Sequence, residues 1–148
     1  MCEDLLNLGI VPQKTKQLKI PVIPSQLVFH FIRGYFDGDG NVWSGTINNK
    51  RITPTRVLQI TFTSGCRPFL FALRSLLNKN GIKGGAVYLP KNKQFGRLTF
   101  STVSALLLAN AMYADQSKLY LSRKKKKLDD FVSTYKPRKN IAIPEPLV

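Results

Sequence analysis

The most informative segment of the chain ends in two aspartates, each followed by a glycine. It reads Phe31-Ile32-Arg33-Gly34-Tyr35-Phe36-Asp37-Gly38-Asp39-Gly40. The apolar residues before the acids predict a helix over residues 26–36, buried on most sides, capped by Ser25 and ending near residues 37–40. Gly34 and Gly38 are four residues apart and share a helix face, where they allow another backbone to approach closely. If this helix packed against a copy of itself, two Asp39 carboxylates would meet, and such oxygens suit a hard divalent cation.

Charge is distributed very unevenly along the chain. The 148 residues include 23 Lys and Arg but 8 Asp and Glu, for a net charge of +15, which points to a polyanion. No acid occurs from Gly40 to Ala114, where the cations are Lys50, Arg51, Arg56, Arg67, Arg74, Lys79, Lys83, Lys91, Lys93 and Arg97. Without acids nearby, these cations indicate contact with a phosphate backbone. Two aspartates beside such a surface repel phosphate unless a divalent metal bridges them to it.

Composition excludes several classes of protein. The chain fits one domain, and 43% hydrophobic residues are enough for a core. There is no run of 18 apolar residues, and the acidic N-terminus lacks signal-peptide character. Two cysteines, Cys2 and Cys66, make a reducing intracellular compartment the default, such as a bacterial or phage cytoplasm or an organelle matrix. With one histidine, His30, a Cys/His zinc site is nearly excluded, and His30 is predicted to be a packed or capping residue rather than a catalyst.

The remaining pattern predicts an α+β fold. Strands are expected over residues 41–47, 56–63, 86–89 and 95–101, and helices over 68–80, 103–113 and 119–135. Leu58, Ile60 and Phe62 alternate with polar residues, which predicts a four-stranded antiparallel sheet with helices on one face. Residues 1–24 are a connector with a short helix at 3–8, residues 25–135 are the domain, and 136–148 are an irregular tail.

The other face of this sheet is expected to meet nucleic acid, because polar side chains reach phosphates and base edges. The candidates are Asn41, Trp43, Gly45, Gln59, Thr61, Thr63, Lys91, Lys93, Arg97, Thr99 and Ser101. Trp43 faces that side if Val42 faces the core, and the alternative is an ordinary core aromatic. An anionic membrane is the competing polyanion, but no basic amphipathic helix outside the Arg123 region supports it.

Two plainer interpretations of the aspartate segment remain. An EF-hand calcium loop begins with the same acid spacing, but the match fails at Val42, where glycine is required, and at Asn48, where glutamate is required. The segment is otherwise a Gly-Asp turn without function.

Residues 32–40 resemble the nine-residue LAGLIDADG motif of homing endonucleases. Gly34, Asp37, Asp39 and Gly40 match the motif, while Arg33 and Gly38 replace its alanines. The resemblance covers roughly residues 25–135 and implies an αββαββα fold with a saddle-shaped sheet. It further implies a site-specific double-stranded DNA endonuclease of the kind that mobile introns carry, which hydrolyses phosphodiester bonds with a divalent metal such as Mg²⁺.

The resemblance also implies roles for individual residues. Asp39 is the expected catalytic metal ligand, joined by the carbonyl of Gly38, while Asp37, Gly34 and Gly40 serve the helix end and helix packing. A polar residue that orients water is expected at Gln59, Thr63 or Ser64. A lysine near the site is expected in the basic run, with Lys124 as the choice beside Arg123 and Lys125. A solvated helix face or a phosphate clamp is the alternative for that run.

A single motif cannot complete a paired site, so the resemblance implies a homodimer through the motif helix and a nearly palindromic DNA target. Residues 8–21 resemble the segment that joins the halves of two-motif relatives, which leaves the C-terminal half of a longer protein as an alternative. A catalytically silent DNA- or RNA-binding relative, maturase-like or regulatory, is the other alternative.

Overall fold

A computed structural model describes residues 17–115 and 119–135 of the chain. The helix expected at residues 3–8 and the tail from residue 136 lie outside the described residues. The elements are η2 (Ser25–Leu27), α2 (Val28–Asp39), β1 (Gly40–Ile47), β2 (Thr55–Ser64), α3 (Arg67–Lys79), β3 (Ala86–Tyr88), β4 (Gly96–Ser101), α4 (Val103–Met112) and α5 (Ser122–Thr134). The α+β fold is confirmed, with an antiparallel sheet in the order β1-β2-β4-β3.

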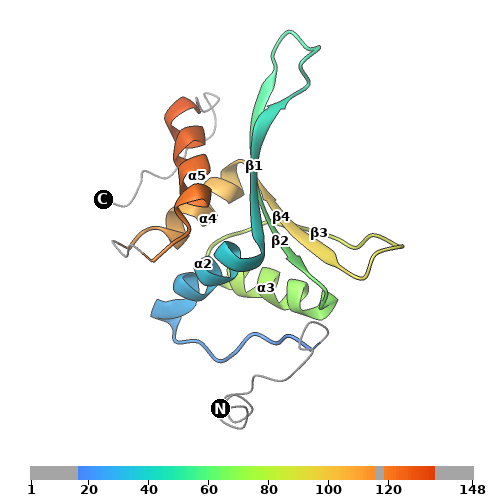
Figure 1. Ribbon diagram of the computed structural model, residues 1–148, viewed down its shortest axis with the longest axis vertical. Coiled ribbons are helices and arrows are strands. Elements are labelled where there is room, and N and C mark those ends of the chain that lie inside the picture. Colours follow the sequence, from blue (N-terminus) through green and yellow to red (C-terminus); the bar gives the residue numbers. More distant parts are fainter. Residues whose placement is uncertain (1–16, 116–118, 136–148) are drawn as a thin grey trace.

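One apolar core lies between the sheet and the helices. Leu58, Ile60 and Phe62 of β2 are fully buried, as are Leu98 and Phe100 of β4, which the register places beside them. Helix α3 adds a buried stripe of Phe69, Leu70, Leu73 and Leu77. The helices gather on one side of the sheet and leave the other open (Figure 1). The predicted alternation along β2 therefore gave the correct inner face.

Helix α2 differs from its prediction in length and in burial. It continues to Asp39, follows the 3-10 turn η2, and has no side-chain cap, so Ser25 does not cap it. Only one face is buried, through Val28, Ile32, Arg33 and Phe36. The opposite face carries exposed residues, namely Leu27, His30, Gly34 and Gly38. The prediction of burial on most sides is wrong for the single chain, because α4 and the sheet cover only one side of α2.

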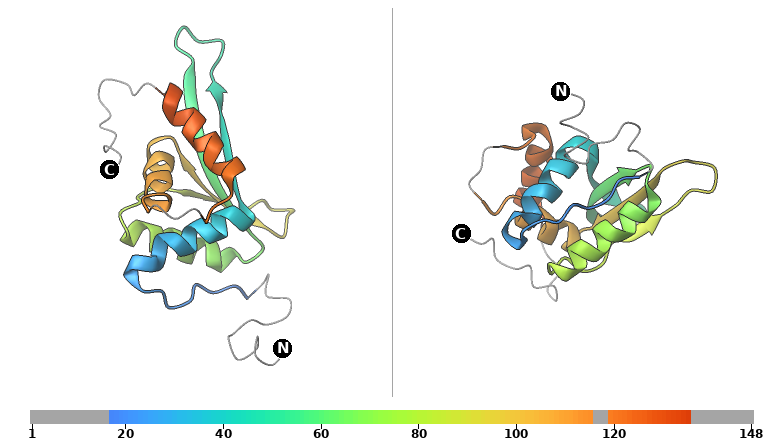
Figure 2. Two further views of the ribbon diagram at one scale, coloured as in Figure 1. Left: turned by 60° about the vertical axis from the view of Figure 1, so that its left-hand side comes forward. Right: turned by 90° about the horizontal axis from the view of Figure 1, so that it is seen from below.

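Helix α5 lies alongside β1 on the helix side of the sheet (Figure 2). It begins at Ser122 rather than near residue 119, because Leu121 is extended, and it buries Lys124, Leu128 and Phe131 at helical spacing. Arg56 of β2 donates a hydrogen bond to the Thr134 hydroxyl at 2.5 Å and lies 5.4 Å from the Phe131 ring centroid. Helix α5 thus braces the β1–β2 hairpin.

Within residues 17–115 and 119–135, none of the helices has the length and apolar character needed to cross a membrane.

Candidate nucleic-acid interface and metal site

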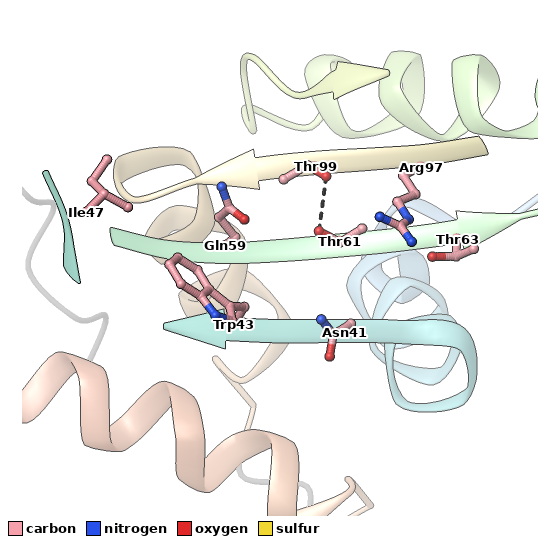
Figure 3. A pocket seen from close by; sticks show the side chains of 8 residues that line it. All are labelled: Asn41, Trp43, Ile47, Gln59, Thr61, Thr63, Arg97 and Thr99. Carbon is pink, nitrogen blue, oxygen red and sulfur yellow. Dashed lines mark hydrogen bonds between the residues drawn. The ribbon is translucent and has the colours of Figure 1, made fainter. Parts of the chain in front are cut away.

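The open face of the sheet carries a groove of about 610 Å³. Its lining residues come from β1, β2 and β4: Asn41, Trp43, Ile47, Gln59, Thr61, Thr63, Arg97 and Thr99 (Figure 3). Seven of these eight were predicted from the alternation, and Ile47 was not, although it continues the same every-second-residue pattern on β1. The groove is therefore polar, with a single large aromatic side chain among its lining residues.

Strand register explains why these side chains gather. Asn41 lies opposite Thr61, which lies opposite Thr99, and the two threonine hydroxyls are 3.0 Å apart. In the neighbouring row Trp43 lies opposite Gln59. Because side chains alternate along a strand, these residues share the open face while Val42 and Ile60 face the core. Trp43 is 43% exposed, so it is not the core aromatic that the sequence left as an alternative.

Four predicted contacts lie outside the groove lining. Gly45 of β1 is half-buried, and a Cβ atom added there would meet the Trp43 ring. Lys91 and Lys93 are exposed in the loop between β3 and β4, and Ser101 is exposed at the end of β4. Tyr88 of β3, which the sequence analysis missed, is 63% exposed and lies opposite Arg97. Tyr88 alternates with Val87 along β3, but a strand of three residues is too short for this alternation to be recognised in the sequence.

The structure corrects the view that all the cations in the acid-free stretch serve phosphate. Arg67 donates to the Lys93 carbonyl at 3.1 Å, and Arg74 donates to the Gly84 carbonyl at 3.3 Å. Arg56 is held by α5 on the helix side of the sheet. These three guanidinium groups bind neutral acceptors and hold the fold, while Arg97 lines the groove and lies over the Phe95 ring.

Asp39 ends α2 and is exposed just before β1 begins. In the part of the chain that the structure describes, its carboxylate makes no hydrogen bond or ion pair. Gly38 is exposed in the same last turn, where helix carbonyls have no partner from the helix itself. These oxygens suit a hard divalent cation. No group of three His, Cys, Asp or Glu residues gathers among the described residues, so one chain offers a partial donor set.

Asp37 is engaged elsewhere. Its Oδ2 accepts a hydrogen bond of 2.9 Å from the backbone N–H of Leu121, just before α5. Its Oδ1 is buried and has no hydrogen-bond partner within the described residues. The carboxylate therefore belongs to the junction between α2 and α5.

Lys124 lies beneath the motif rather than in the groove. It is 6% exposed, and its Nζ donates to the carbonyls of Phe36 at 2.5 Å, Asp37 at 2.9 Å and Gly40 at 2.5 Å. Burial lowers the pKa of this ammonium, and the nearby Asp37 partly opposes that effect. Of the neighbouring candidates, Arg123 is exposed, and Lys125 pairs with Asp129 at 2.8 Å.

Two of the three candidates for orienting water line the groove. Gln59 and Thr63 do so, whereas Ser64 is buried and accepts a hydrogen bond from the Cys66 N–H at 3.1 Å. The Tyr35 hydroxyl donates to the Thr63 carbonyl at 2.9 Å, which ties α2 to the end of β2 near Asp39. Burial raises the pKa of Tyr35, so this phenol remains a donor.

The substitution at Arg33 has a structural explanation. Arg33 leaves α2 on its inner face, donates to the Met112 carbonyl at 3.0 Å and pairs with Asp115. Its other nitrogen lies 3.0 Å from His30 Nδ1, which makes His30 a surface partner of this cluster. The arginine therefore ties α2 to the end of α4 and leaves the glycine face free.

A sequence profile described as a LAGLIDADG-like domain matches residues 26–109. Two solved structures of the homing endonuclease I-CvuI are similar. The first, in complex with its target in the presence of calcium, shares 15% identity and a TM-score of 0.57, over 73% of this chain and 65% of that chain. The second, with uncleaved DNA in the presence of magnesium, shares 14% identity and a TM-score of 0.54, over 82% and 90%.

The group I intron-encoded homing endonuclease I-CeuI, complexed with DNA, is also similar. It shares 14% identity and a TM-score of 0.55, over 89% of this chain and 62% of that chain. At such identities the likeness is one of fold, and this chain spans about two thirds of the length of the first I-CvuI chain. No curated protein matches the sequence.

Proposed function

The chain belongs to the LAGLIDADG family, and on that premise we propose that it is a metal-dependent, site-specific endonuclease for double-stranded DNA that acts as a homodimer. The observation that carries the proposal is the position of Asp39, an exposed carboxylate two residues before Asn41 of the polar groove, without a protein partner in the described ranges. A carboxylate in that position repels DNA unless a cation joins it to phosphate.

The groove supports the choice of DNA as substrate. Hydroxyl, amide and guanidinium groups from Thr61, Gln59 and Arg97 face outward from adjacent strands, and a two-stranded ribbon fits the major groove. Arginine forms bidentate hydrogen bonds with guanine, and side-chain amides form bidentate hydrogen bonds with adenine. The net charge of +15 supplies the attraction to phosphate that such reading requires.

The free face of α2 supports the homodimer. A Cβ atom added at Gly34 or Gly38 meets nothing within 4 Å in the single chain. Leu27 on the same face is 46% exposed, so a second copy packed there would cover an apolar side chain as well as the two glycines. A second copy packed there would bring two Asp39 carboxylates together, because a two-fold interface uses the same patch twice.

Mg²⁺ is the cation we propose, and the calcium and magnesium in the I-CvuI complexes support a divalent ion. When bound, it neutralises phosphate charge and lowers the pKa of water. Asp39 and the Gly38 carbonyl hold it, Gln59 or Thr63 orients the attacking water, and the threonine and arginine side chains of the groove hold the duplex. No histidine base is required, which agrees with the place of His30 beside Arg33.

The test starts by selecting bound duplexes from a randomised DNA library, with Ca²⁺ present. The selected duplex is then incubated with Mg²⁺ and the wild-type chain, Asp39→Asn, or Asp130→Asn as a matched control on α5. We expect both wild type and the control to cut both strands, and Asp39→Asn to bind the duplex equally well without cutting. Cutting by Asp39→Asn at the wild-type rate would refute the role of Asp39. Binding without cutting by the wild type would instead indicate a silent DNA- or RNA-binding relative.

A further inference from the structure

The end of α2 and the start of α5 exchange capping groups. Asp37 of α2 accepts a hydrogen bond from the N–H of Leu121, the N-cap residue of α5. Lys124, in the first turn of α5, donates to three carbonyls at the end of α2. We propose that this reciprocal cap, formed by Asp37, Leu121, Lys124 and those carbonyls, fixes the position of Asp39, and that Lys124 is a positioning residue. The proposal deepens the proposed function, and rests on it for the role of Asp39.

The three carbonyls bracket the two proposed metal ligands. Phe36 and Asp37 precede Gly38 and Asp39 in the chain, and Gly40 follows them. One ammonium therefore fixes the backbone on both sides of a two-residue segment. Hydrogen bonds from a charged donor are the strong ones, and burial keeps water from competing for these carbonyls.

The contacts of Lys124 leave little for a direct part in the reaction. An ammonium has three protons to donate, and three carbonyls accept from it. The Nζ also lies 4.9 Å from the centroid of the Phe36 ring, which encloses it further. To give a proton to a departing oxygen, Lys124 would have to release one of its anchors, and it does not line the groove.

Charge favours the same arrangement. A helix carries partial negative charge at its C-terminus and partial positive charge at its N-terminus. Lys124 places a cation at the end of α2, and Asp37 places an anion at the start of α5. Helix α5 lies beyond residues 26–109, which match the family profile, so this chain fixes its motif with an element outside that range.

The test is hydrogen exchange of the backbone amides of residues 38–41, measured on the free protein without DNA or metal. In Lys124→Met we expect these amides to exchange roughly 10- to 100-fold faster than in wild type, after correction for any common change at Ile60 and Phe100. That range corresponds to the loss of one hydrogen bond to a charged group. Lys126→Met, an exposed neighbour on α5, is the matched control and should leave the exchange unchanged.

Lys124→Arg separates positioning from charge alone. The planar guanidinium group of arginine cannot direct three donors at carbonyls that converge on one point. We therefore expect the amides of residues 38–41 to exchange as fast in Lys124→Arg as in Lys124→Met. If Lys124→Met is too unstable to study, Asp37→Asn removes the charge from the other half of the cap, and should accelerate the Leu121 amide and residues 38–41 less strongly. Unchanged exchange in Lys124→Met, or in Asp37→Asn if that variant must replace it, would overturn the proposal.

Cleavage of the selected duplex gives a second measurement. We expect the Mg²⁺ concentration for half-maximal cleavage to rise in Lys124→Met and in Lys124→Arg, because a displaced Asp39 binds the ion less well. Loss of the maximal rate with unchanged exchange and unchanged Mg²⁺ dependence would mark Lys124 as catalytic instead. Since exchange is measured without substrate, a chain that cuts no DNA still gives a decision on the reciprocal cap.

Discussion

Replacing Gly34 by alanine should change the stability of the monomer and the stability of the dimer in opposite directions. Gly34 lies inside α2, and a Cβ atom there meets nothing within 4 Å. Alanine favours a helix interior over glycine by about 1 kcal/mol, so the monomer should gain that amount, or about 4 °C in Tm. The added methyl group has free space in the single chain, but it lies in the contact surface of the proposed dimer.

The cost to the dimer follows from symmetry. Each added methyl enters a two-fold interface twice, once from each copy. An extra methyl in a close-packed contact costs about 1–3 kcal/mol, so the dimer should lose about 2–6 kcal/mol. At about 1.4 kcal/mol per factor of ten, the dimer Kd should rise at least about 27-fold.

Sedimentation equilibrium over a range of protein concentrations measures the dimer, and thermal unfolding at concentrations low enough for monomers measures the single chain. Ser75→Ala, on the exposed side of α3, is the control, because it also improves a helix but lies away from α2. An unchanged dimer Kd in Gly34→Ala, or a monomer of lower Tm, would refute the argument that this face of α2 is the interface.

Three other substitutions test the groove and the supports of α2. Arg97→Ala should reduce the slope of log K against log salt for DNA binding by about 1, as read from fluorescence anisotropy, if Arg97 contacts phosphate; an unchanged slope would remove that contact. Asp115→Ala should lower the unfolding free energy by about 3 kcal/mol in urea, because it strips the carboxylate from buried Arg33, and adding Arg33→Met should recover part of the loss; no recovery would contradict the ion pair. Tyr113→Phe should keep or raise stability at pH 7 by about 1 kcal/mol, since the buried phenol has no partner within the described ranges. Burial raises the pKa of Tyr113, so its phenol ionises at lower pH in the unfolded chain than in the folded chain. The unfolding free energy of the wild type should therefore fall above pH 10, and that of Tyr113→Phe should fall less. An equal loss of stability in the two proteins would refute the raised pKa.

The sequence was most informative where one period governs a whole element. The alternation on β2 assigned Leu58 and Ile60 to the core and Gln59 and Thr61 to the open face, and the register confirms both. Gly81, which follows α3, has a φ of +88°, the left-handed conformation that favours glycine at the end of a helix. These features depend on local backbone geometry, which neighbouring residues determine.

The features that the sequence did not predict depend on contacts between distant segments. The partners of Lys124 lie 84 to 88 residues away, and Asp115 lies 82 residues from Arg33. The basic run on α5 looked uniform because charge alone does not show which lysine turns inward. The exposure of α2 was missed for a related reason, since apolar content does not tell whether the same chain or another copy covers a surface.

The position of α5 has a consequence for engineering. At one end this helix holds the β1–β2 hairpin through Arg56, and at the other it holds the end of α2 through Lys124. The hairpin and the segment that carries Asp39 are therefore attached to the same helix. Substitutions in the hairpin that move α5 should also move Asp39. For the endonuclease proposed above, libraries confined to positions 41, 43, 59 and 61 should leave both attachments of α5 intact, whereas a library that includes Arg56 should change sequence preference and cutting together.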